Sequence, residues 1–330
     1  MLEIFIHSFH SNFCRNQMLN QTAVTEFILQ GFSDDRDFQI LHFVLFFSLY
    51  LVTMVGNTLI IITVAQSNNL HNPMYFFLAV LSSVDFCFIS TTVPKSMVSS
   101  LMNDNVISFA GCITQVFLVV SCATAETFLL TIMACDRYVA ICHPLQYKLI
   151  MNWNVCLHIT IIALVCGVIT GVGHAANTFR LDFCSSNIVE QYFCDIPQLL
   201  RLSCTTTETN ENITFGLVLS VGSFCFMFVS ISYCFIFSTV FKIKSTQGQY
   251  KVFSTCIPHL TVFCLFVCTV MFSYMRPKAL SSPSLDLLAA VLYTILPPLM
   301  NPIIYSLRNT EIKMSLCKMG KKYFRFHILT

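Results

Sequence analysis

The chain has 330 residues, of which 55% are hydrophobic and only 10% are charged. Soluble globular domains carry about 25% charged residues, so the composition excludes an ordinary soluble protein. So apolar a chain indicates membrane lipids as its surroundings, and we expect no nucleic-acid partner.

Seven nearly uncharged stretches recur along the chain, and each is long enough to cross the hydrocarbon core as a helix, which takes about 20 residues. A spanning β-barrel would show segments of about 10 residues with alternating polarity, and these stretches do not alternate. The sequence therefore predicts an all-α membrane protein, a bundle of seven transmembrane helices. The stretches lie at about residues 40–66, 74–94, 105–135, 149–179, 212–241, 252–275 and 287–307.

The chain before the first stretch, residues 1–39, is predicted to be an extracellular N-terminus. Residues 1–17 lack the sustained apolar core and the small-residue cleavage pattern of a signal peptide. Asn20 begins an Asn-Gln-Thr sequon, and we expect it to be glycosylated. The bundle is assigned to residues 40–307, and residues 308–330 are assigned to a cytoplasmic tail.

Lysine and arginine residues indicate the orientation, because they gather on the cytoplasmic side of membrane proteins. With the N-terminus outside, 11 of the 18 basic residues fall on the inner side and 12 of the 16 acidic residues fall on the outer side. We therefore expect a multi-pass plasma-membrane protein with its N-terminus extracellular and its C-terminus cytoplasmic.

Four of the 17 cysteines fall on the predicted outer side, namely Cys112, Cys184, Cys194 and Cys204. An even number of cysteines facing an oxidising compartment indicates two disulfide bonds, and their spacing permits three pairings. No group of His and Cys residues has the spacing of a structural zinc site.

Two acids fall in the middle of predicted spans, Asp85 in the second and Glu126 in the third. Two neighbouring carboxylates in a low dielectric cannot both stay charged cheaply, so either one is protonated or a cation joins them. A sodium site, with Asn57 and Asn301 as polar partners, and a hydrogen-bonded cluster with one protonated acid are both open. No other cofactor is expected.

The third span carries a second pair of charges at its end, Asp136 and Arg137. Arg137 lies about three helical turns after Glu126 and on nearly the same face, which Val119 and Ala123 share. A charged residue in a span normally faces the bundle interior. The stripe is therefore predicted to face inward, apolar in its first part and basic at its foot.

Seven motifs occur in register between about residues 18 and 318. They are Gly56-Asn57, LHNPMY (70–75), LSSVD (81–85), MACDRYVAICHPLQY (133–147), Ser232-Tyr233, KVFSTCIPHL (251–260) and PLMNPIIYSLRN (298–309). With these motifs the chain resembles a rhodopsin-like (class A) G-protein-coupled receptor and, more narrowly, an odorant receptor.

This resemblance implies a receptor, not an enzyme, that binds a small volatile odorant and activates a stimulatory, olfactory-type heterotrimeric G protein, which raises cAMP. It also implies the bonds Cys112–Cys194 and Cys184–Cys204. After Asn309, the resemblance and the basic, amphipathic stretch together predict a short eighth helix. A membrane transporter or channel is the alternative function, although the chain shows no internal repeat.

The resemblance places the ligand in the outer third of the bundle. The residues expected there are mostly apolar and include no acid, which suits a small uncharged molecule. The expected ligand-binding residues are Val119, Val120, Ala123, Thr124, Ile196, Leu217, Val221, Val270, Met271, Tyr274 and Thr294. His174 could join the outer cysteines in binding copper, but a loop histidine without a role is the simpler interpretation.

The resemblance assigns activation to the inner half of the bundle. Asp136 is expected to hold Arg137 in an ion pair until the sixth span moves outward, when Arg137 can reach Tyr233 and the G protein. Pro302 is expected to bend the seventh span. The residues assigned to activation and G-protein coupling are Asp136, Arg137, Tyr138, Tyr233, Lys251, His259, Asn301, Pro302 and Tyr305.

Overall fold

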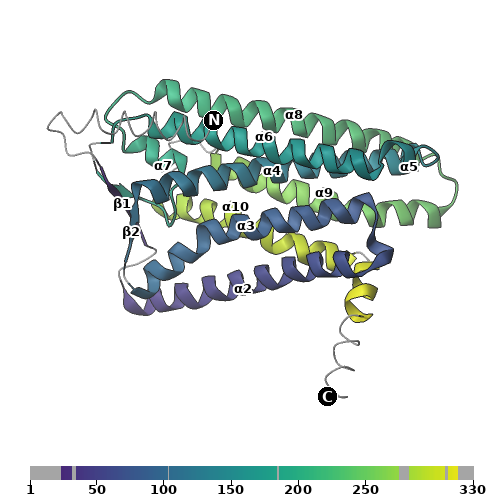
Figure 1. The fold of residues 1–330 in the computed structure, drawn as a ribbon, viewed down its shortest axis with the longest axis horizontal. Helices are drawn as coiled ribbons and strands as arrows, with labels where there is room; N and C mark the ends of the chain where they lie inside the picture. The colour runs from purple at the N-terminus through teal and green to yellow at the C-terminus, as the bar shows by residue number, and fades with distance from the viewer. Residues whose placement is uncertain are drawn as a thin grey trace, which may run out of the picture.

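The computed structural model describes residues 24–31, 35–102, 104–183, 186–274, 282–308 and 311–318. Within this part of the chain, seven helices are long and apolar enough to cross a membrane, which confirms the predicted bundle (Figure 1). They are α2 (Arg36–Gln66), α3 (Pro73–Met102), α4 (Phe109–Cys142), α6 (Trp153–Phe179), α8 (Glu208–Val240), α9 (Thr246–Tyr274) and α10 (Pro283–Arg308).

Side chains just ahead of the helices determine where they begin. The Asp35 carboxylate accepts a hydrogen bond from the N–H of Asp37 at 2.9 Å, and the Ser108 hydroxyl accepts one from the N–H of Gly111 at 3.1 Å. These acceptors pair backbone groups that have no partner within the first helical turn. Helix α2 consequently begins at Arg36, slightly ahead of the predicted boundary.

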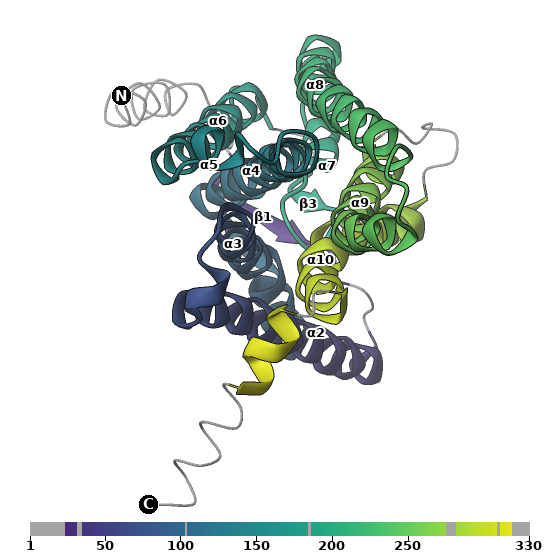
Figure 2. The ribbon, with the colours of Figure 1, turned by 90° about the vertical axis from the view of Figure 1, so that its right-hand side faces the viewer.

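Helix α4 is the central helix of the bundle and packs against α3, α6, α8 and α9 (Figure 2). In its most apolar stretch 61% of the residues are buried, compared with 17% in α8 and 22% in α2. Val119 and Glu126 are among the buried residues, as expected for the inward-facing stripe of the third span. Helices α2 and α8 expose most of their apolar side chains, which suits contact with lipid.

Two glycines allow α6 to lie against α4. A Cβ added at Gly171 would lie 2.1 Å from Ser121 Oγ and 2.7 Å from the backbone oxygen of Phe117. At Gly167, it would lie 2.6 Å from the backbone oxygen of Ser121. Small residues at such positions let two helix backbones approach closely inside a membrane. The neighbouring residues on this face of α6 are therefore held against the centre of the bundle.

A three-stranded sheet lies across one end of the bundle, which we call the sheet end (Figure 1). Its central strand is β1 (Glu26–Leu29), which pairs antiparallel with β2 (Val106–Ser108) and parallel with β3 (Ile188–Val189). The register places Phe27 opposite Ile107. The segment ahead of α2 is thereby joined to the chain on both sides of α4 and α6.

Aromatic packing fixes β1 in place. Phe27 is fully buried, lies 5.9 Å from Phe109 in a stacked arrangement and meets Phe183 edge-on at 5.4 Å between ring centroids. Buried aromatic side chains contribute large apolar areas, and such ring pairs add about 0.5–1.5 kcal/mol each. The sheet is therefore a packed cover over the end of the bundle.

Short helices occupy connections at both ends. One of them, α7, lies at the sheet end, and α5 lies at the opposite end, which we call the α5 end (Figure 1). The two short α-helices are α5 (Tyr147–Ile150) and α7 (Ile196–Arg201). A short 3₁₀ helix, η1 (Asn68–Leu70), lies between α2 and α3.

A short helix follows α10 at residues 311–318, as the sequence predicts. Its Ile312 is buried and its Lys313 is exposed, so the helix is amphipathic. The Tyr75 hydroxyl donates a hydrogen bond to the Glu311 carboxylate at 2.7 Å and joins this helix to the first turn of α3. The remainder of the predicted tail lies outside the described residues.

Candidate functional site

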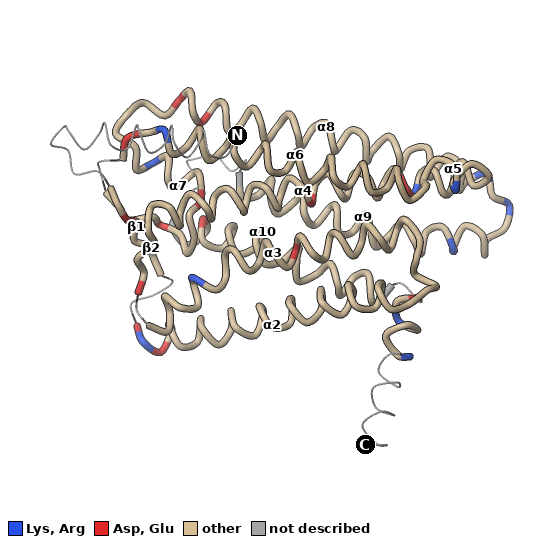
Figure 3. The backbone as a smooth tube through the Cα atoms, in the orientation of Figure 1, with Lys and Arg blue, Asp and Glu red and all other residues tan. Residues whose placement is uncertain are grey.

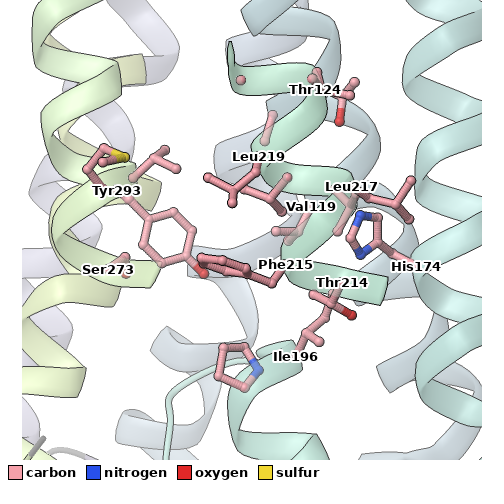
Figure 4. Close-up of a pocket in the computed structure, with 18 of the residues that line it drawn as sticks. Val119, Thr124, His174, Ile196, Thr214, Phe215, Leu217, Leu219, Ser273 and Tyr293 are labelled. Carbon is pink, nitrogen blue, oxygen red and sulfur yellow. The ribbon is translucent and has the colours of Figure 1, made fainter. Parts of the chain in front are cut away.

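A cavity of about 750 Å³ lies between α4, α6, α8, α9 and α10, with α7 at the sheet end (Figure 4). This volume falls within the range of about 300–1,000 Å³ that is usual for small-molecule sites. Most of the lining side chains are apolar. Nine of the eleven expected ligand-binding residues line the cavity: Val119, Val120, Ala123, Thr124, Ile196, Leu217, Val221, Val270 and Met271.

The other two expected residues lie elsewhere. Thr294 is fully buried in α10, donates a hydrogen bond to the Ala290 carbonyl at 2.7 Å and pairs with the Tyr192 hydroxyl. Its polar atoms are occupied within the protein, so it packs behind the cavity wall. Tyr274 is the last residue of α9, and its side chain lies outside the described part of the structure. Tyr293, one residue before Thr294, lines the cavity instead.

The expectation that no acid lines the cavity is wrong. Asp195, Glu211 and Asp286 all line it at the sheet end. Asp195 accepts a hydrogen bond from Tyr293 at 3.2 Å, and Asp286 forms an ion pair with Arg201 at 3.6 Å. The sequence did not reveal these acids because they come from a loop and from helix ends that only the folded chain brings together. Each has a partner within the protein, so the apolar part of the cavity remains uncharged.

His174 is also misplaced by the sequence interpretation. It lies within α6, is only 2% exposed and lines the cavity. Its Nδ1 atom is buried and has no hydrogen-bond partner. Among the described residues, no three His, Cys, Asp or Glu side chains are grouped as metal ligands, and Cys194 is in a disulfide, so nothing here resembles a copper site.

The two acids of the predicted spans meet in the middle of the bundle. Asp85 and Glu126 are both buried and lie next to each other. The Asn301 amide donates to Asp85 Oδ2 at 2.8 Å, and the Asn57 amide donates to the Pro298 carbonyl at 3.0 Å. The four polar side chains expected to cooperate therefore come from α2, α3, α4 and α10.

Oxygen atoms in this group are left without partners. Asp85 Oδ1, Glu126 Oε1, Asn57 Oδ1 and Asn301 Oδ1 are all buried and unpaired, as is the Ser82 hydroxyl. Leaving a buried polar group unpaired costs about 1–3 kcal/mol. Carboxylate and amide oxygens are the ligands that hard cations prefer, so the residues fit a sodium ion.

At the α5 end, Asp136 and Arg137 form the predicted ion pair. Asp136 is fully buried and accepts hydrogen bonds from two guanidinium nitrogens of Arg137. The bond from Nε is 3.1 Å long. The second Asp136 oxygen accepts a hydrogen bond from the Tyr147 hydroxyl of α5 at 2.7 Å. Burial and the nearby Asp136 carboxylate raise the pKa of Tyr147, so its hydroxyl stays protonated and donates.

A second hydrogen-bonded chain joins α4, α8 and α9. His259 Nε2 lies 2.8 Å from the Leu130 carbonyl oxygen, which can only accept, so this nitrogen carries the proton. His259 Nδ1 is then the acceptor for the Tyr233 hydroxyl at 2.9 Å. In this conformation the Tyr233 hydroxyl is hydrogen-bonded to His259.

The other residues assigned to activation lie around these groups. Tyr305 is buried with an unpaired hydroxyl, and Lys251 is exposed on α9. Pro302 packs against α2, where a Cβ added at Gly56 would lie 3.0 Å from its ring. Tyr138 pairs its hydroxyl with a nitrogen of His143 at 3.1 Å.

One of the two expected disulfide bonds is present, between Cys112 at the start of α4 and Cys194 in the loop before α7. Cys204 is also disulfide-bonded, while its expected partner Cys184 lies outside the described residues, as does the sequon residue Asn20. The backbone N–H of Cys194 donates to Gln115 at 2.8 Å, which further ties the loop to α4.

The family model for olfactory receptors matches residues 46–322, which begin within α2 and include the six later spans. The chain belongs to the olfactory receptor family. It is 48% identical to human olfactory receptor 14C36 over 93% of this chain and 98% of that one. It is 48% identical to human olfactory receptor 14A16 over 91% of this chain and 96% of that one, and 42% identical to mouse olfactory receptor 5T17 over 95% and 97%.

Membership of this family makes the protein an odorant receptor of the G-protein-coupled class and not an enzyme. It also favours the receptor over the transporter or channel that the sequence left as an alternative. With seven spans, the receptor is a multi-pass protein of the plasma membrane.

Proposed function

We propose that this receptor binds a small, uncharged, volatile odorant in the cavity and activates a stimulatory, olfactory-type heterotrimeric G protein, which raises cAMP. The observation that carries the proposal is that one helix, α4, both lines the cavity and ends in the Asp136–Arg137 ion pair. From Thr127 in the cavity wall to Arg137 is about 15 Å along the helix. A shift of α4 or its neighbours can therefore act on both.

We also propose that the sheet end is extracellular and the α5 end cytoplasmic. Lysines of α5, of the connection between α8 and α9 and of residues 311–318 gather at the α5 end (Figure 3). Basic residues mark the cytoplasmic side. The Cys112–Cys194 bond lies at the sheet end, and disulfide bonds persist in an oxidising compartment.

Activation then follows from a shift between two conformations. An odorant that binds the active bundle more tightly raises the population of that conformation. Outward movement of α9 breaks the contact between His259 and the Leu130 carbonyl and frees Tyr233. Arg137 then exchanges Asp136 for Tyr233 and for the G protein.

The variant Arg137→Ala tests this mechanism in cells that carry a cAMP reporter and are screened with a library of volatiles. We expect odorant-driven cAMP to be lost while surface expression remains detectable. Arg180→Ala is the matched control, because Arg180 is an exposed arginine at the sheet end. Retained signalling by Arg137→Ala would show that the ion pair is not part of the mechanism.

We further propose that a sodium ion binds between Asp85 and Glu126, with the amide oxygens of Asn57 and Asn301 completing the site. The support is the set of unpaired buried oxygens in this group. The ion would neutralise carboxylate charge and hold α2, α3, α4 and α10 together in the inactive arrangement.

Thermal unfolding of the purified receptor tests the sodium site. Sodium at ten times its Kd should stabilise the receptor by about 1.4 kcal/mol relative to N-methylglucamine at equal ionic strength. Asp85→Asn should remove this dependence, whereas Asp182→Asn, at an exposed position, should retain it. Equal unfolding temperatures in the two salts would leave the hydrogen-bonded cluster as the correct interpretation.

A further inference from the structure

Close packing of α6 against α4 determines where His174 lies. Gly171 and Gly167 leave no room for a side chain between the two helices. His174 follows Gly171 by one helical turn and lies on nearly the same face. Its imidazole is therefore directed to the centre of the bundle, where it lines the cavity although α6 is among the less buried spans.

The imidazole lacks the hydrogen bonds that a buried histidine normally makes. It is 2% exposed, its Nδ1 is unpaired, and no hydrogen bond to the ring is found among the described residues. Figure 4 shows it beside Thr214 and Leu217, across the cavity from Tyr293 and Ser273. A neutral imidazole has one donor and one acceptor nitrogen. A molecule in the cavity is the partner available to it.

Two hydroxyl groups of the cavity wall offer only acceptors. The Thr127 hydroxyl donates to the Ala123 carbonyl and the Thr170 hydroxyl donates to the Cys166 carbonyl, both at 2.8 Å. Each hydroxyl has a single hydrogen, so these two side chains present only lone pairs to the cavity. A ligand oxygen that can donate therefore has acceptors available in these two side chains.

We propose that the cavity recognises the hydroxyl group of an odorant alcohol, with His174 as its hydrogen-bond partner. The inference rests on the proposed odorant-binding function and narrows the ligand to one chemical class. The ligand O–H donates to the ring nitrogen that lacks a proton. The hydrocarbon part lies against Val119, Leu217 and the other apolar residues of the wall.

Other functional groups fit this environment less well. A ketone, an ester or an ether can accept but cannot donate, so it leaves the threonine lone pairs unmet. A protonated amine donates but brings a charge into an apolar region, which is costly unless it is paired. The acids that line the cavity already have partners at the sheet end. His174 carries no negative charge, so it cannot form an ion pair with the amine.

Binding to the purified receptor tests the proposal independently of signalling. The first probes are octanol, octanal, heptyl methyl ether, nonane and octylamine, which have equal numbers of heavy atoms. A second series places the same groups on a ring: menthol, menthone, menthyl methyl ether, menthane and menthylamine. Affinities are measured from ligand-dependent thermal unfolding. The alcohol of at least one series should bind about tenfold more tightly than its ether, which one hydrogen bond of about 1.4 kcal/mol supplies.

Variants of α6 identify the partner. His174→Leu should weaken the alcohol about tenfold and change the ether and hydrocarbon by less than about twofold, so these two probes report whether the cavity is intact. His174→Gln keeps a donor and an acceptor and should retain most of the alcohol preference. His158→Leu is the matched control, because His158 is an exposed histidine of the same helix.

Three results would overturn the proposal: no alcohol binds in either series, the amine or carbonyl compound binds more tightly than the alcohol, or His174→Leu keeps the alcohol preference. Failure of the proposed function would appear differently, as binding without odorant-driven cAMP in the reporter cells. The two failures are therefore distinguishable.

Discussion

Asp136 holds two different partners at once. One carboxylate oxygen accepts from Arg137 in α4, and the other accepts from Tyr147 in α5. A buried carboxylate is stable only when its lone pairs are occupied. The Tyr147 hydrogen bond therefore stabilises Asp136 in the position that retains Arg137, which is the inactive conformation in the proposed mechanism.

The variant Tyr147→Phe should raise signalling without odorant. It removes one hydrogen bond from the inactive conformation, worth about 1 kcal/mol, or roughly a fivefold change in the balance between conformations. The measurement is basal cAMP normalised to receptor at the cell surface. Tyr50→Phe is the matched control, since it removes a tyrosine hydrogen bond to Ser90 far from Asp136. Basal cAMP equal in the two variants would contradict a role for Tyr147.

The ion pair itself was predictable from the sequence, because its two residues are adjacent. Tyr147 was not, because its contact depends on how the connection after α4 turns back at His143 and on where α5 then lies. The residues of the cavity also divide into those that the sequence predicts and those that it does not. Residues with helical spacing on α4 were found, whereas Asp195 and Asp286 depend on the path of a loop and on a helix end.

Among the helices, α6 approaches α4 closely at its glycines. A Cβ at Gly171 would meet both a side chain and the Phe117 backbone oxygen, which cannot move away as a flexible side chain can. The close approach also directs His174 into the cavity. One small residue thus affects both the packing of a helix and the shape of the ligand site.

We expect Gly171→Ala to destabilise the purified receptor by about 1–3 kcal/mol, the usual cost of overpacking. Gly173→Ala lies on the same helix with nothing within 4 Å of the added Cβ, so it should be neutral or slightly stabilising. Thermal unfolding of the two variants in parallel compares their stability. If Gly171→Ala unfolds at the same temperature as Gly173→Ala, the close contact does not hold the helices together.

Element by element, the spans were predictable and the sheet was not. Apolar runs report the length of a membrane crossing, so all seven were found, but helices continue past the run. Helix α3, for example, extends to Met102, beyond the charge at Lys95. Strand β1 has only four residues, and its partners are distant in the sequence. Nothing local distinguishes such a strand from a loop.

At the scale of the molecule, α4 joins three levels. Its first half lines the cavity, Glu126 meets Asp85 in the middle, and the Asp136–Arg137 pair lies near its end. In the middle, Asn301 of α10 donates to Asp85 of α3, and toward the end α4 forms hydrogen bonds with α5, α8 and α9. Movement of one helix therefore changes hydrogen bonds at more than one level.

Such an arrangement requires that odorant and G protein affect each other's binding. A G protein that prefers the active conformation raises the receptor's affinity for odorant. By thermodynamic linkage, odorant raises the receptor's affinity for the G protein by the same factor. We expect nucleotide-free G protein to tighten odorant binding by about 5–150-fold, the usual range of such coupling. The measurement is odorant affinity for the purified receptor with and without the G protein, and with GTPγS to release it.

Arg137→Ala separates coupling from binding. It leaves the cavity untouched but removes the ion pair that retains the inactive conformation, so odorant affinity without G protein should equal or exceed that of the unmodified receptor. The increase caused by G protein should disappear, because the guanidinium that would join the two partners is absent. Arg36→Ala, which alters an arginine of α2 at the sheet end, should keep the full increase. An undiminished increase in Arg137→Ala would mean that the connection between the two ends of the bundle does not pass through this residue.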